Sequence, residues 1–140
     1  MNRLEVELVD YVLVIRVDDR ELWEVIREIE FPTAAAHGQP DLAGSYAFLE
    51  LSTVQAPSLH LLGKATNPLL EREGKVSLME CGCGIEGCWP LYMRITVVDE
   101  TVIWSDPQQP HRKTWAYPEE WRLVFDRRQY EEALSRLTYA

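Results

Sequence analysis

The stretch MRITVVDETVIWS, residues 93–105, decides the fold, because apolar and polar side chains alternate on both sides of Asp99-Glu100. Such alternation is typical of antiparallel strands that are joined by a short turn. The register set by this turn places large apolar side chains opposite one another on one face, as the pairs Ile95–Trp104 and Val97–Val102. The sequence therefore predicts a β-hairpin with one buried face, and Asp106-Pro107 is expected to end its second strand.

Further strands are predicted on both sides of this hairpin. Residues 4–8 alternate and residues 11–15 are continuously apolar, which indicates two strands or one long bent strand. Residues 75–80 and 121–125 alternate again, and a short strand is expected within residues 46–51.

An amphipathic helix is predicted in the N-terminal half of the chain, over about residues 19–30. Its apolar side chains recur at helical spacing, as Leu22, Val25, Ile26 and Ile29. The acidic pair Asp18-Asp19 is expected to cap its start. Phe31-Pro32 is expected to end it, which leaves residues 33–44 as a loop.

A second helix is predicted over about residues 126–137, with Asp126 as its N-cap. Strands in hairpin order, with helices near each end of the chain, indicate an α+β fold: a mainly antiparallel sheet on which the two helices pack. The 140 residues, of which 46% are apolar and 26% charged, fit a single domain over residues 1–140.

The charge of the chain limits its partners and its location. A formal net charge of −9 would repel nucleic acid and anionic membranes, so neither is an expected partner. Residues 1–5 carry acid where a signal peptide is apolar, and the apolar run at residues 11–15 is too short to span a bilayer. The expected location is therefore the cytoplasm.

All three cysteines lie in one glycine-rich stretch, CGCGIEGC, residues 81–88, which we call the cysteine knuckle. Three thiols at this spacing could bind Zn²⁺, which takes about four tetrahedral ligands drawn from cysteine and histidine. The metal ligands predicted on this interpretation are Cys81, Cys83, Cys88 and, as the fourth, His111, which follows the hairpin's second strand.

Other interpretations of the cysteine knuckle stay open. Cysteine is among the most buried residue types, so the three side chains could only fill a cramped turn. A redox pair, Cys83 and Cys88, or a catalytic thiol would require a lowered thiol pKa and a neighbouring base.

The segment HRK, residues 111–113, is a basic island in an acidic chain, and Trp115, Tyr117 and Trp121 follow it. This mixture could bind an acidic or aromatic partner. The alternative is an ordinary surface loop that is anchored by its aromatic side chains.

Several short stretches of the second half resemble one family of bacterial proteins. They are CGCG at 81–84, GCWPL at 87–91, VIWSD at 102–106, QPHR at 109–112 and FDRRQY at 125–130. The family has no assigned activity. The resemblance implies a bacterial cytosolic domain and supplies no catalytic or binding residue.

Three functions therefore follow from the sequence. The first is a small, acidic, non-enzymatic binding domain whose partner is another protein, since no catalytic motif is found. The second is a domain stabilised by zinc at the cysteine knuckle, with zinc as the only cofactor expected. The third is a thiol-based redox protein or enzyme.

Overall fold

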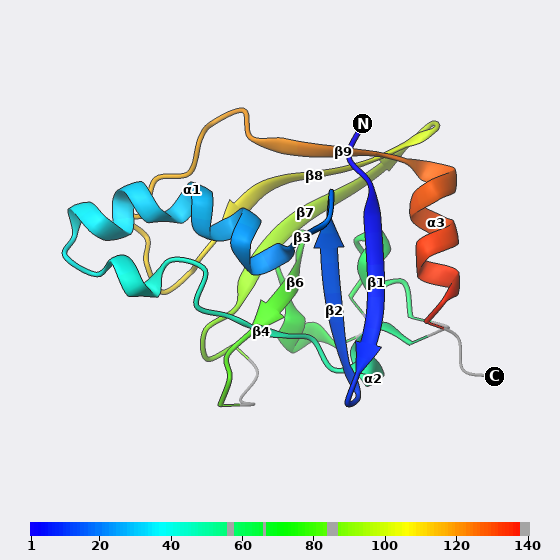
Figure 1. The fold of residues 1–140 in the computed structure, drawn as a ribbon, viewed down its shortest axis with the longest axis horizontal. Helices are drawn as coiled ribbons and strands as arrows, with labels where there is room; N and C mark the ends of the chain where they lie inside the picture. The colour runs from blue at the N-terminus through cyan, green and yellow to red at the C-terminus, as the bar shows by residue number, and fades with distance from the viewer. Residues whose placement is uncertain (56–57, 66, 84–86, 138–140) are drawn as a thin grey trace.

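The computed structural model describes residues 1–55, 58–65, 67–83 and 87–137, and it has the predicted α+β fold. Its antiparallel strands form two sheets (Figure 1). The smaller sheet contains β1 (Leu4–Val9), β2 (Val12–Val17) and β3 (Arg20–Glu21). The larger sheet contains β4 (Ala47–Phe48), β5 (Glu71–Arg72), β6 (Lys75–Glu80), β7 (Leu91–Val98), β8 (Thr101–Gln108) and β9 (Arg122–Asp126).

The helices flank the β1–β2 hairpin, with α1 (Leu22–Ala36) on one side and α3 (Arg127–Ser135) on the other (Figure 1). The short elements of the middle of the chain are α2 (Leu51–Val54), η1 (Pro40–Leu42), η2 (His60–Leu62) and η3 (Pro68–Leu70). No helix among the described residues is long and apolar enough to cross a membrane.

The β7–β8 hairpin confirms the predicted register. Ile95 pairs with Trp104 and Val97 with Val102 across the two strands. Trp104 and Val102 are fully buried, whereas Thr96 on the opposite face is exposed. The alternation of the sequence thus identified the buried face.

The prediction that Asp106-Pro107 ends the second strand is wrong, because β8 continues to Gln108. The register shifts between Tyr92 and Arg94 on the partner strand, and Asp106 adopts a φ of 53°. A bulge at this point lets the strand pass a proline, which has no N–H to contribute to the ladder.

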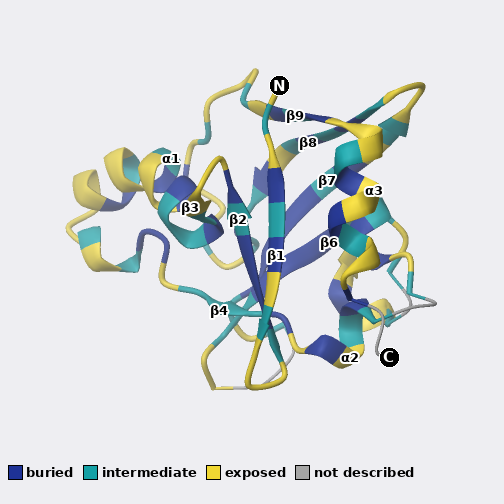
Figure 2. Cartoon of the chain, turned by 45° about the vertical axis from the view of Figure 1, so that its right-hand side comes forward, coloured by how far each residue is buried: buried dark blue, intermediate teal, exposed yellow. Residues whose placement is uncertain are grey.

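The centre of the core is an aromatic cluster of Trp104 on β8, Phe125 on β9 and Tyr130 on α3. The ring centroids lie 5.0 Å apart for Trp104 and Phe125, and 5.2 Å apart for Phe125 and Tyr130. Trp104 Nε1 donates a hydrogen bond of 3.1 Å to the Tyr130 hydroxyl, which in turn donates to Leu61 O at 2.5 Å. The cluster therefore joins three elements with its polar atoms satisfied. In Figure 2, β8 and β9 include buried residues where they face the core, and the outer side of α3 is exposed.

The N-terminal residues form two strands rather than one bent strand. β1 and β2 pair through a turn at Asp10-Tyr11, where both residues have positive φ. This hairpin is fastened to the larger sheet by a bridge from Asn2 to Phe125. The side-chain amide of Gln129 on α3 also donates to Leu4 O at 2.6 Å.

The helix α1 differs from the prediction at both ends. Asp18-Asp19 does not cap it but forms the turn between β2 and β3, with φ of 51° and 67°. The Asp18 carboxylate accepts hydrogen bonds from Asn2 Nδ2 and Arg3 N at 2.7 and 2.8 Å.

At its other end, α1 continues past Pro32 to Ala36, so the predicted stop at Phe31-Pro32 is wrong. Residues 34–36 are alanines, the best helix formers, and Ala34 is fully buried in a second small core beside Ala43 and Trp115. Burial of this turn outweighs the hydrogen bond that Pro32 cannot make.

The helix α3 agrees with the prediction to within two residues at its C-terminal end. Its N-cap is Asp126, whose carboxylate accepts a hydrogen bond of 3.0 Å from Gln129 N. The predicted short strand within residues 46–51 is also present, shortened to β4.

The substitution Pro32→Ala tests the length of α1. We expect it to raise the free energy of unfolding by about 1–2 kcal/mol, because alanine restores a helical hydrogen bond at an interior position. The measurement is urea denaturation, and the matched control is Pro118→Ala in an exposed loop. A helix that ends at Glu30 would give no gain over the control.

Candidate metal centre

The cysteine knuckle connects the end of β6 to the start of β7. Residues 84–86 of the knuckle lie outside the described residues, so the description rests on residues 81–83 and 87–88. Gly87 adopts a φ of 76°, a backbone conformation that favours glycine. The chain thus turns back toward Cys81 immediately before Cys88.

The three cysteine Sγ atoms converge, and all lie within 4.8 Å of one another. A tetrahedral Zn²⁺ with Zn–S bonds of about 2.3 Å holds its sulfur ligands about 3.8 Å apart. The cluster therefore needs little contraction to accept the ion.

The three side chains are thiols near the surface, with Cys81 half-buried and both Cys83 and Cys88 exposed. The interpretation that they fill a cramped turn as buried apolar residues is therefore wrong. The glycines around them allow the backbone to turn without burying the sulfur atoms.

A carboxylate at the end of β6 holds the returning arm of the knuckle. Glu80 Oε1 accepts a hydrogen bond of 3.1 Å from Gly87 N, and Glu80 Oε2 accepts one from the Ser77 hydroxyl. Ser77 is fully buried in β6, so its hydrogen bond fixes the Glu80 carboxylate, and with it Gly87, to the sheet.

The electrostatics of the cluster oppose Cys88 as a reactive thiol. Hydrogen bonds with Cys83 and Cys81 raise the pKa of the Cys88 thiol to about 11. Catalytic and redox-active thiols need a lowered pKa, because the thiolate is the nucleophile. A bound divalent cation would instead lower the pKa of the coordinating thiols and deprotonate them.

His111 lies beside the knuckle but makes a different contact from the one predicted. Its Nε2 is 2.9 Å from Gly87 O, and its ring stacks on Trp89 with centroids 6.3 Å apart. Within the described residues, the convergent ligand atoms belong to the cysteines alone. The role of His111 as fourth ligand stays a prediction.

Among the described residues, neither of the other two histidines belongs to the group of convergent metal ligands. His37 is an exposed residue at the end of α1. His60 is fully buried, its Nε2 lies 2.6 Å from Ser77 O, and burial lowers its pKa.

An aromatic cluster next to the knuckle is centred on Trp89. The Trp89 ring stacks with Tyr46 at 6.5 Å, meets Trp115 edge-on at 6.0 Å and has the Arg112 guanidinium 4.8 Å above it. Trp115 is buried, so for this residue the interpretation as an anchoring aromatic side chain is confirmed. Trp121 packs partly buried against the main core.

A buried carboxylate that we did not predict connects α1 to this cluster. Glu30 is 1% exposed and accepts hydrogen bonds from Gly44 N at 2.9 Å, Tyr46 Oη at 2.6 Å and Tyr117 Oη at 2.5 Å. The sequence carried a signal, because Glu30 follows Leu22 and Ile26 at intervals of four on the apolar face of the helix.

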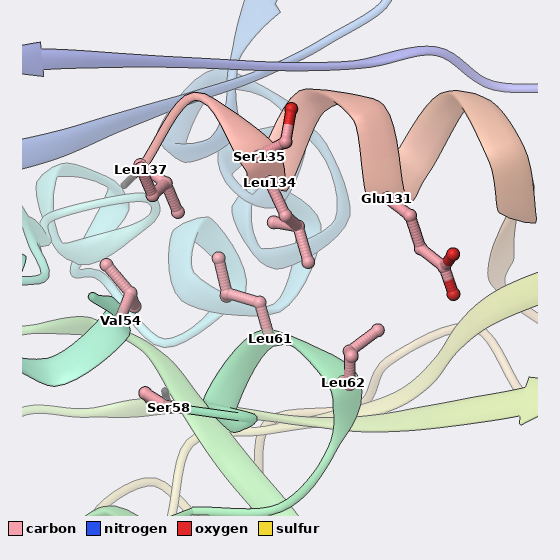
Figure 3. A pocket seen from close by; sticks show the side chains of 8 residues that line it. All are labelled: Val54, Ser58, Leu61, Leu62, Glu131, Leu134, Ser135 and Leu137. Atoms are coloured by element: carbon pink, nitrogen blue, oxygen red, sulfur yellow. The ribbon is translucent and has the colours of Figure 1, made fainter. Parts of the chain in front are cut away.

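A separate hollow of about 250 Å³ lies between α3 with Leu137 on one side and Val54 with residues 58–62 on the other (Figure 3). Its walls are mainly leucine side chains, with Glu131 at one end. Glu131 forms an ion pair with Arg127 at 2.8 Å, so the hollow offers mainly apolar surface and few polar groups that could bind a ligand.

Comparison of the chain with protein-family models, with curated proteins and with solved structures found no significant match. The family suggested by the short stretches of the second half therefore stays an expectation.

The substitution Glu30→Gln tests the buried carboxylate. Burial raises the pKa of Glu30 above its ordinary value of 4.5, so the folded protein holds this proton more tightly than the unfolded chain. Wild-type stability should then decline as pH rises from 4.5 through the folded-state pKa, relative to a variant that lacks the group.

We expect Glu30→Gln to be less stable by about 1–3 kcal/mol near the lower end of this range, because the amide NH2 cannot accept a hydrogen bond as the hydroxyl of the protonated carboxyl can. The difference in the free energy of unfolding between wild type and variant should narrow as pH rises, as measured by urea denaturation at a series of pH values. Glu119→Gln, at an exposed position, is the control. A difference that does not change with pH would contradict the account.

Proposed function

We propose that the protein is a non-enzymatic binding domain in which Zn²⁺, held by Cys81, Cys83 and Cys88, organises the cysteine knuckle beside a binding surface. The observation that supports this most strongly is the convergence of the three Sγ atoms within 4.8 Å. The binding surface is the segment of residues 107–117, which contacts the knuckle through His111.

Exposure of the thiols favours a metal over simple packing. The described residues of the knuckle are exposed or half-buried, so the packing of their side chains adds little to hold its conformation. Metal binding to three thiolates would supply the missing free energy, since the energy of coordination becomes folding energy. The zinc would therefore be structural.

The fourth coordination position is assigned to His111 on chemical grounds. A metal-bound histidine commonly donates its other ring N–H to a backbone carbonyl, which fixes the tautomer. Nε2 of His111 lies 2.9 Å from Gly87 O, and the tautomer that donates there keeps its lone pair on Nδ1. Nδ1 is therefore the His111 atom that would be available to the metal.

A redox or catalytic thiol is the weaker proposal. The raised pKa of Cys88 keeps its thiol protonated near neutral pH in the metal-free protein. The neighbouring imidazole of His111 contacts a carbonyl rather than a sulfur, so it supplies no paired base for a nucleophile.

Metal content is the direct test of this proposal. Protein purified without chelators or a histidine tag should contain about one zinc per chain, because three thiolates and an imidazole complete one tetrahedral site. Replacement by Co²⁺ should give the thiolate charge-transfer and tetrahedral d–d absorption bands. Cys83→Ser and Cys88→Ser should each lose most of the metal.

His111→Ala separates the fourth ligand from the three cysteines. We expect it to weaken zinc binding by at least about tenfold, whereas His37→Ala should leave the affinity unchanged. Metal-free protein whose Cys83 and Cys88 thiols are alkylated rapidly near neutral pH would overturn the zinc assignment and favour a redox role.

A further inference from the structure

A pocket of about 240 Å³ opens between β6 and the segment that follows β8. Its lining includes three cationic side chains, Lys75, Arg112 and Lys113, together with Gln108 and Trp115. We propose that this pocket binds a small molecule through an oxyanionic group, a phosphate or a carboxylate. The inference gives a ligand class to the binding role proposed above, but it requires no metal.

The charge of the lining is opposite to that of the chain. The protein has 23 acidic and 14 basic residues, yet no Asp or Glu lines this pocket. Asp106, whose charge acts on Lys75, is paired with Arg94 at 3.1 Å. Among the described residues, none of the three pocket cations has a carboxylate oxygen within 4.0 Å. The pocket thus gathers three positive charges, none of which forms an ion pair with a described carboxylate.

The Lys75 ammonium has lost part of its water, and no described carboxylate oxygen lies within 4.0 Å of it. Its Nζ donates a hydrogen bond of 3.0 Å to Gln108 Oε1, a neutral acceptor. Burial is the main cause that lowers the Lys75 pKa, with contributions of both signs from neighbouring charges. An anion in the pocket would offset this desolvation.

The Arg112 guanidinium is held in position before any ligand arrives. It lies 4.8 Å above the Trp89 ring, and its Nη1 donates to His111 O at 2.9 Å. Guanidinium presents five N–H donors in a planar fork, so most remain for two oxygens of one phosphate or carboxylate group. Such preorganisation reduces the entropy lost on binding.

The acidity of the whole chain favours a small ligand over a polyanion. A nucleic acid or an anionic membrane would meet the net charge of −9 over a wide surface. A small anion interacts mainly with charges within about one Debye length, about 8 Å at physiological ionic strength. Among the charges that act on Lys75, the carboxylates of Asp106 and Glu73 are matched by Arg94 and Arg72, which leaves the pocket cations in excess.

The side chain of Trp115 provides an internal probe of the pocket. Trp115 lines the wall, and its buried Nε1 has no hydrogen-bond partner among the described residues. Its indole N–H signal in a ¹H–¹⁵N spectrum should therefore shift when the pocket fills. Assignment of the five tryptophan indoles by Trp115→Phe identifies the signal.

The test is a titration of the full chain with inorganic phosphate and, separately, with succinate, by calorimetry at low and constant ionic strength. We expect saturable binding of at least one anion. The anion with the lower Kd shows whether the pocket prefers a phosphate or a carboxylate. Lys75→Gln and Arg112→Gln should each weaken it by roughly tenfold, the loss of one charge-assisted hydrogen bond.

Lys113→Gln keeps the test valid if the other variants are poorly folded, because Lys113 is exposed and its replacement should not change the packing. We expect this substitution to lower the affinity for the anion several-fold. Lys64→Gln, at another exposed lysine, is the matched control. Reduced anion binding with unchanged zinc content would support the pocket independently of the metal centre. No saturable binding of either anion, or equal affinity in all variants and the control, would overturn the proposal.

Discussion

The packing of Trp104 against Phe125 and Tyr130 is the interaction on which the rest of the structure depends. It joins β8, β9 and α3 at full burial, and the Tyr130 hydroxyl extends the contact to Leu61 at the start of the middle segments. Phe125 also bridges to Asn2, so the same cluster fixes the N-terminal hairpin to the larger sheet. Loss of one of these rings would leave a cavity and, for Tyr130, unpaired polar atoms on Trp104 and Leu61. The sheet that positions β6 and β7, and with them the cysteine knuckle, is built outward from this point.

A second, more polar centre determines the surface around the knuckle. Glu30 gathers hydrogen bonds from three segments that are distant in sequence, through Gly44, Tyr46 and Tyr117. The buried amide of Gln109 extends this network, because its Nε2 donates to Pro90 O at 3.0 Å, where the chain leaves the knuckle. Such a network is stable only when each member is satisfied, so it specifies one arrangement of α1 and the segment after β8. The aromatic cluster and the segment that lines the basic pocket therefore share this buried hydrogen-bond network.

The sequence predicted best those elements whose signal is local. The alternation in residues 93–105 identified both the register and the buried face of the β7–β8 hairpin, and Asp126 identified the start of α3. The errors came where tertiary contacts override local preference: α1 passes Pro32 because Ala34 packs against Trp115, and β8 passes Pro107 through a bulge. For the site, the sequence grouped the cysteines correctly, but it could not show that they are exposed or that Lys75 joins Arg112 and Lys113 around one pocket. These residues lie on segments that only the folded sheet brings together.

We propose that the convergent thiols of Cys81, Cys83 and Cys88 hold a metal, which in turn fixes the surface of the neighbouring segment. The convergence and the exposure of the sulfurs support such a site, and hydrogen bonds among the thiols account for the raised pKa of Cys88 in the metal-free protein. X-ray absorption at the zinc edge of the purified protein tests this most directly, since it reports the atoms bound to the ion. The account predicts about three sulfur scatterers at about 2.3 Å and one lighter ligand at about 2.0–2.1 Å. A first shell made of oxygen and nitrogen alone would show that any zinc present is bound elsewhere, and would contradict the account.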